Sequence, residues 1–122
     1  MNLPVTYNFE PHYKDDGLAG FILKLTYPSG EVVDLTGCSA LMQLRIPEYR
    51  KDGKVIWEFS SEAEDPLKLL VLNSSGEIQF PRIESWDIPK DNYQYDLQVT
   101  DSLGFVRTFM KGIFPVNQDV SR

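Results

Sequence analysis

Cysteine and histidine are almost absent from this sequence, and each scarcity removes a class of protein. The 122-residue chain has one cysteine, Cys38, so no disulfide can form within it, and a secreted mini-domain held by disulfides is excluded. The one histidine, His12, would have to serve as the base of any Ser-His-Asp or Cys-His arrangement, and no nucleophile-elbow pattern accompanies it. One Cys and one His cannot build a zinc site by themselves. We therefore predict no catalytic, metal-binding or cofactor-binding residue, and a protein that is not an enzyme.

An excess of basic charge and long hydrophobic runs are missing too. Twelve Lys and Arg face eighteen Asp and Glu, and the formal net charge of −6 opposes binding to phosphate backbones and to anionic membranes. Glycines occur singly, without a phosphate-binding loop pattern. No run of about 18 apolar residues exists, and no basic region followed by an apolar stretch opens the chain. The sequence predicts a chain made in the cytoplasm, with no nucleic-acid and no membrane partner.

Alternation with a period of two residues runs through most of the chain, whereas the 3.6-residue period of helices is limited to one turn at residues 83–88. In residues 93–100 the side chains of Tyr93, Tyr95, Leu97 and Val99 fall on one face, with polar side chains between them. Similar strands are expected at 19–27, 31–36, 39–46, 55–59, 67–72, 77–80, 105–110 and 112–116. Turn residues separate them, which is typical of an antiparallel sandwich or barrel. We expect an all-β, antiparallel immunoglobulin-like β-sandwich of about 7–9 strands.

The alternating region defines the expected domain organisation. Residues 19–116 are predicted to form the β-sandwich domain, residues 1–18 an N-terminal arm with a first strand, and residues 117–122 a C-terminal tail. Both ends flank the alternating region and add little apolar surface to its core. We expect them to contact neighbouring subunits in an assembly.

Aromatic residues offer the best candidate contacts with partners. Trp57 lies in phase with strand residues and is expected in the core. Tyr13, Tyr49 and Trp86 lie in or near predicted loops, so they are the candidate partner contacts. Flat rings also stack on the apolar faces of sugars. A carbohydrate-binding β-sandwich module for adhesion to a host surface is therefore an alternative function.

Six short motifs occur in a recognisable order. GEVVDLTG occupies residues 30–37 and YQYDL residues 93–97. The others are MQLR at 42–45, GEIQF at 76–80, GFVRT at 104–108 and KGIFPV at 111–116. Over residues 20–117 the chain resembles a family of small all-β bacteriophage virion proteins, found in tails, necks and baseplates, with the same DLTG and YDL motifs.

The resemblance implies a non-enzymatic virion structural protein, made in the host cytoplasm, that acts through protein–protein assembly. Its partners would be other virion proteins and further copies of itself in a homo-oligomer. The family motifs correspond here to structural residues and to no catalytic residue. These residues are Asp34, Leu35, Thr36 and Gly37, and Tyr95, Asp96 and Leu97.

Physical chemistry gives the polar motif residues structural roles. Asp34 and Thr36 are expected to accept hydrogen bonds from backbone donors in a turn around Gly37, as Asx and Ser/Thr turns do. Asp96 is expected to face away from the apolar side of its strand. There it would cap a neighbouring loop or pair with Arg45 or Arg107 across the sheet.

Overall fold

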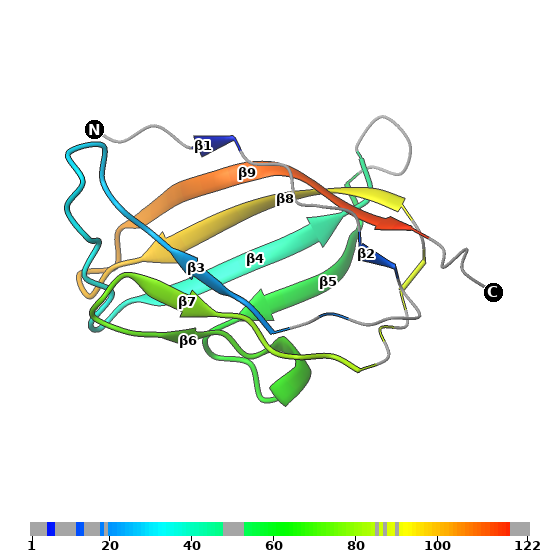
Figure 1. The fold of residues 1–122 in the computed structure, drawn as a ribbon, viewed down its shortest axis with the longest axis horizontal. Coiled ribbons are helices and arrows are strands. Elements are labelled where there is room, and N and C mark those ends of the chain that lie inside the picture. The colour runs from blue at the N-terminus through cyan, green and yellow to red at the C-terminus, as the bar shows by residue number, and fades with distance from the viewer. Residues whose placement is uncertain are drawn as a thin grey trace.

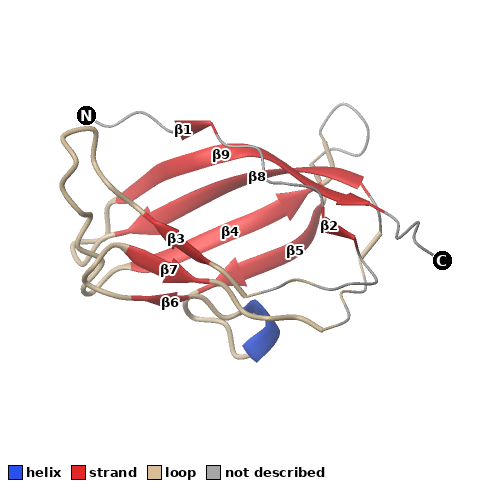
Figure 2. Cartoon of the chain, in the orientation of Figure 1, coloured by secondary structure: helices blue, strands red, loops and turns tan. Residues whose placement is uncertain are grey.

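The regular structure of the described residues is almost entirely β-strand in a computed structural model (Figures 1 and 2). The structure describes residues 5–6, 12–13, 18, 20–47, 53–84, 86, 88–89 and 91–117. Within them the strands are β1 (Val5–Thr6), β2 (His12–Tyr13), β3 (Ile22–Lys24), β4 (Ser39–Arg45), β5 (Val55–Ser60), β6 (Val71–Leu72), β7 (Glu77–Gln79), β8 (Asp91–Thr100) and β9 (Val106–Asn117). They form two sheets, and the expectation of an all-β sandwich is confirmed.

The larger sheet has the strand order β1-β9-β8-β4-β5. Strands β9, β8, β4 and β5 are antiparallel neighbours, while β1 and β2 each pair with β9 in parallel over two residues. Strands β4 and β8 form the centre of this sheet. Their side chains alternate between buried and less buried positions, as the two-residue period predicts.

The smaller sheet has the order β3-β7-β6, with antiparallel pairing throughout. The predicted hairpin that follows β3 is present, because Thr26 bridges Val32 and the Val33 amide donates to Leu25 O at 3.1 Å. Figure 1 shows the smaller sheet in front of the larger one, so the two sheets form separate layers.

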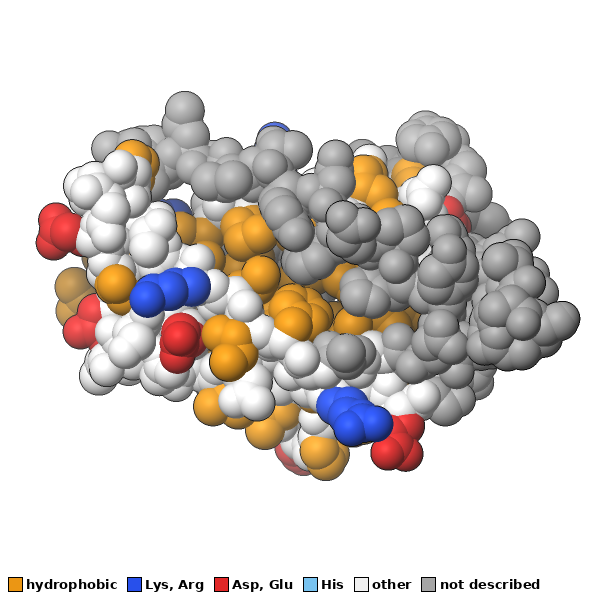
Figure 3. Space-filling model, in the orientation of Figure 1, with side chains coloured by type: hydrophobic (Ala, Val, Ile, Leu, Met, Phe, Trp, Pro, Cys, Tyr) orange, Lys and Arg blue, Asp and Glu red, His pale blue; other side chains and the backbone are white. Residues whose placement is uncertain are grey.

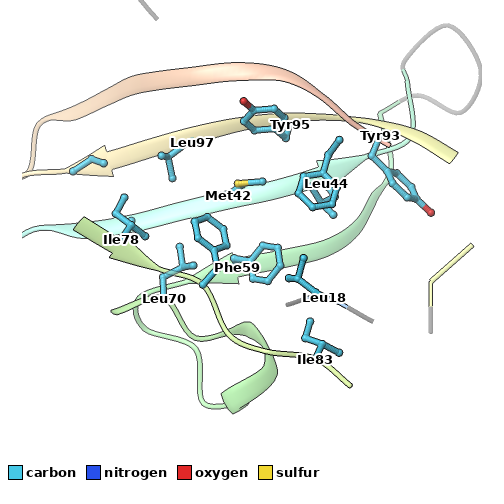
Figure 4. Packing of buried hydrophobic residues seen from close by; sticks show 14 of the residues in the cluster. Leu18, Met42, Leu44, Phe59, Leu70, Ile78, Ile83, Tyr93, Tyr95 and Leu97 are labelled. Atoms are coloured by element: carbon cyan, nitrogen blue, oxygen red, sulfur yellow. The ribbon is translucent and has the colours of Figure 1, made fainter. Parts of the chain in front are cut away.

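The hydrophobic core lies between the layers. Figure 4 shows Met42 of β4, Leu97 of β8 and Phe59 of β5 beside Ile78 of β7. All four side chains are fully buried. Burying a side chain of this size stabilises a fold by about 1.5–3 kcal/mol, so the packing of one sheet on the other is the main source of stability.

Several expected elements differ in the structure. Of the strand expected at 67–72 only Val71–Leu72 (β6) is a strand, and of that expected at 31–36 only Val32 takes part in a β-bridge. The described residues of 83–88 contain no helix, because Ile83 exchanges backbone hydrogen bonds of 2.7 and 2.8 Å with Leu18. The single described helical turn, η2, spans Pro66–Lys68 and begins where Asp65 Oδ1 accepts a hydrogen bond from the Leu67 amide. The strands expected at 105–110 and 112–116 are one strand, since β8 pairs with β9 along its whole length.

The N-terminal arm is described only in part. Its residues 5–6 and 12–13 lie along β9 of the same chain, and the buried Leu18 belongs to the core. The core therefore begins no later than residue 18. The tail expected at 117–122 lies outside the described residues apart from Asn117 at the end of β9. None of the helical structure described is long and apolar enough to cross a membrane.

Candidate functional site

Several turns gather at one end of the sandwich, on the left in Figure 1. We call residues 27–38, 73–76 and 99–109 the turn end. Gly76 O accepts a hydrogen bond of 2.7 Å from the Leu25 amide, which ties the β6–β7 turn to the hairpin after β3. A Cβ on Gly37 would lie 3.3 Å from Ser102 Cβ, so these two turns also touch. The turns that carry or adjoin the DLTG, GEIQF and GFVRT motifs therefore lie next to one another in space.

The DLTG segment forms the turn that its residues predict. Asp34 Oδ1 accepts a hydrogen bond of 2.9 Å from the Thr36 amide, and the Cys38 amide donates to Leu35 O at 3.0 Å. Leu35 is buried, and Gly37 has a φ of 74°. The expected Asx turn at Asp34 is present, so this carboxylate has a structural task.

The same hydrogen bonds change the acidity of Asp34. Donation from the Thr36 hydroxyl, and then from the Thr36 amide, lowers the pKa of the carboxyl below its ordinary value of 3.8. The carboxyl is thus ionised at neutral pH and places a negative charge on the turn end.

A second aspartate holds the β8–β9 turn. Asp101 Oδ1 accepts hydrogen bonds from the amides of Leu103 at 2.9 Å and Phe105 at 3.0 Å, and Gly104 has a φ of 90°. The turn presents its apolar side chains outward. Leu103, Phe105 and Val106 are 81%, 70% and 61% exposed. Three large apolar side chains are therefore kept in water by a well-bonded turn.

A pocket of about 370 Å³ adjoins this turn. It contains aromatic and aliphatic side chains together with charged groups of both signs. Its lining is Tyr27, Val33, Asp34, Cys38, Val99, Asp101, Phe105, Val106, Arg107 and Phe109. The Arg107 guanidinium lies 5.9 Å from the centre of the Phe109 ring.

The thiol in this pocket is not set up as a nucleophile. Cys38 Sγ lies 3.9 Å from Thr36 O, to which the thiol donates a weak hydrogen bond. Desolvation, followed by the negative charges of Asp101 and Asp34, raises the pKa of the thiol above its ordinary value of 9.0. The thiol is therefore protonated at neutral pH. No group of three or more His, Cys, Asp or Glu residues that could hold a metal ion occurs in the described part of the chain.

The YDL residues lie away from the turn end, within β8. Tyr95 and Leu97 are buried, as the alternation predicts. The residues directly opposite Asp96 are Gln43 on β4 and Lys111 on β9, instead of the expected arginines. The register explains this difference, because Arg45 faces Gln94 and Arg107 faces Val99. The Arg45 guanidinium donates a hydrogen bond to the Gln43 side chain.

The prediction that Trp86 is an exposed partner contact is wrong. Trp86 is 1% exposed, and its ring packs edge-to-face on Trp57 at 5.6 Å and on Phe114 at 5.8 Å between centroids. The ring is therefore part of the hydrophobic core. A sugar cannot stack on this ring, and the carbohydrate-binding alternative loses its main residue. Tyr49 and the side chain of Tyr13 lie outside the described residues.

Sequence reasoning did not find Leu103, Phe105 and Val106 as surface residues. Residues 101–104 are a predicted turn, and a leucine inside such a turn is the signal that could have identified them. No sequence pattern marks the pocket, because its lining comes from segments up to 82 positions apart, between Tyr27 and Phe109.

The comparisons with known proteins add little to this geometry. No protein-family model matches the sequence, and no curated protein matches it. Among solved structures, a chain that comprises extracellular domains 3–5 of Drosophila OTK aligns with a TM-score of 0.34 and 22% sequence identity. The alignment covers 89% of this chain and 33% of that chain, so this chain spans about a third of its length. A TM-score this low supports no inference about fold or function.

Proposed function

We propose that this chain is a non-enzymatic structural subunit of a bacteriophage virion, in a tail, neck or baseplate, that acts through protein–protein contacts. The observation that carries the proposal is the set of three large apolar side chains at the tip of the β8–β9 turn. Keeping Leu103, Phe105 and Val106 in water costs free energy, and large exposed apolar patches commonly mark interaction sites. That the assembly is a virion is inferred from the motif resemblance over residues 20–117.

We also propose that the sandwich is of the immunoglobulin-like kind. Strand order supports this, because β9-β8-β4-β5 and β3-β7-β6 correspond to the G-F-C-C′ and B-E-D orders of such folds. A second support is Tyr93 near the start of β8, whose hydroxyl donates to Pro89 O a few residues upstream. This contact has the geometry of the tyrosine corner of immunoglobulin-like domains.

Quantitative mass spectrometry of gradient-purified phage particles tests the function. We expect the chain to sediment with the particles at a constant ratio to the other virion proteins. A chain present in the infected cell but absent from purified particles would contradict the proposal.

A variant pair tests whether the turn end takes part. Leu103→Ser combined with Phe105→Ser should lower incorporation into particles several-fold, because it removes apolar contact area. Ile22→Ser is the matched control, since Ile22 is 57% exposed but lies on β3 of the smaller sheet. Equal incorporation of both variants would show that assembly uses another surface.

A further inference from the structure

We propose that the turn end is a self-association surface through which two copies of this chain bind each other about a two-fold axis. The proposal rests on the assembly function above and names one partner for it. Three properties of the surface carry it: its apolar area, its shape and its charge.

The apolar area is concentrated at one place. Leu103, Phe105 and Val106 lie within four consecutive residues and are the three most exposed large hydrophobic side chains of the described residues. The other strongly exposed ones, Ile22 and Val71, lie on β3 and β6 of the smaller sheet. Figure 3 shows charged side chains beside hydrophobic ones on the face that carries this sheet. Among the described residues, the tip of the β8–β9 turn thus has the most exposed apolar side chains to remove from water.

The shape of the turn end is complementary to itself. Leu103 projects from the turn, and its neighbours Phe105 and Val106 also line the pocket of about 370 Å³. A protruding side chain and a pocket therefore lie side by side on one surface. A two-fold axis places Leu103 of each copy against the pocket of the other copy, which is the arrangement of an isologous interface.

The pocket lining carries charges of both signs, which a second copy of the chain can complement. The pocket lining carries the Asp34 and Asp101 carboxylates together with the Arg107 guanidinium. Each carboxylate has about four acceptor sites on its two oxygens, more than the turn hydrogen bonds use, so each can still accept a further hydrogen bond. A two-fold contact brings Arg107 of each copy towards the carboxylates of the other. A surface of one sign would instead repel its own copy, in a chain of net charge −6.

The size of the surface predicts a weak contact. A stable interface covers about 800 Å² on each partner, whereas an exposed apolar patch on a monomer is typically about 300–600 Å². We expect a dissociation constant of roughly 0.1–1 mM for the isolated chain. Several such contacts within one particle would reinforce one another through their high effective concentration.

Sedimentation equilibrium of the full chain, from about 10 μM to 1 mM, tests the proposal. We expect a share of dimers that increases with concentration. Leu103→Ser should weaken dimerisation about tenfold or more. Its side chain is 81% exposed, so folding is not at risk. Ile22→Ser should leave dimerisation unchanged.

Arg107→Glu is the second variant, and it should also weaken dimerisation, because it sets a further negative charge against Asp34 and Asp101 of the other copy. A chain that remains monomeric at the highest concentration would overturn the proposal, as would dimers unaffected by both turn-end variants. This outcome differs from failure of the proposed function. A monomeric chain that still enters particles overturns only self-association, and a dimeric chain absent from particles overturns only the virion function.

Discussion

Gly76 is the residue at which the β6–β7 turn meets the hairpin after β3. Its φ is +75°, and a Cβ at this position would lie 2.7 Å from Leu25 O and 2.8 Å from Val32 Cγ1. Both the backbone conformation and the available space exclude a side chain. The glycine of the GEIQF motif thus has a packing reason that is independent of any ligand.

Gly76→Ala should therefore lower the free energy of unfolding by about 3 kcal/mol, which combines left-handed strain with overpacking. Gly30→Ala is the matched control, because Gly30 has a φ of +93° but no heavy atom beyond its own residue and its two chain neighbours lies within 4 Å of the place that a Cβ would take. It should cost only about 1–2 kcal/mol. Urea denaturation of both variants measures the difference. Equal losses would mean that the contact with the hairpin has no energetic role.

Asp34 makes a contribution to stability that depends on pH. Its pKa is lowered in the folded chain, so its contribution is present above the ordinary value of 3.8 and is lost as the pH falls through the folded pKa. Asp34→Asn keeps an oxygen that can accept from the Thr36 amide but cannot titrate. Urea midpoints measured between about pH 2 and pH 6 should decline less steeply for this variant than for the wild type. Identical slopes would contradict the assignment.

At the scale of single elements, the edge strand β5 shows how far alternation predicts structure. Phe59 is buried opposite Met42, as expected. The alternation places Val55 in phase with Phe59, yet Val55 is 40% exposed. A β-bulge explains this, because the register shifts between Leu44 and Arg45 and leaves Ile56 without an opposite residue. A bulge leaves no mark in an alternating sequence, so the pattern could not reveal it.

A charged side chain, in addition to the bulge, protects the β5 edge of the larger sheet from pairing with other chains. The Ser61 amide donates to Ala40 O, so these two residues form a hydrogen-bonded pair of the antiparallel ladder. Because hydrogen-bonded and non-hydrogen-bonded pairs alternate, Glu58 and Gln43 form a non-hydrogen-bonded pair, and the backbone groups of Glu58 point away from β4. Glu58 thus places a charge in the middle of the open edge, where its carboxylate accepts a hydrogen bond of 2.7 Å from the Gln43 side-chain amide. Charges and bulges on edge strands hinder pairing with other chains.

Glu58→Val should consequently increase aggregation on heating, with a change in unfolding free energy of only about 0.5 kcal/mol. Glu62→Val provides the control, because Glu62 is exposed in the turn that follows β5 and its replacement removes the same charge. Light scattering during a thermal ramp compares the two. If both variants aggregate alike, net charge rather than the edge position is responsible.

At the scale of the whole molecule, the sequence predicts the strands better than their arrangement. Alternation in β8 identifies its four inward side chains correctly, since burial follows from the pleat of one strand. The pairing of β3 with β7 brings together residues more than 50 positions apart. Long-range packing decides such pairings, and it likewise buries Trp86 and assembles the pocket. The candidate surface therefore appeared only with the fold.

The aromatic cluster in the core gives the molecule an optical property. The Trp57 and Trp86 rings lie 5.6 Å apart with their planes at 80°. Two indoles this close, and not parallel, couple their electronic transitions and contribute a paired band to the circular dichroism spectrum. Since Trp57 belongs to β5 and Trp86 to the connection between β7 and β8, the band reports directly on the closeness of these two segments. The intensity of this band can therefore be used to follow the packing of these two segments during folding.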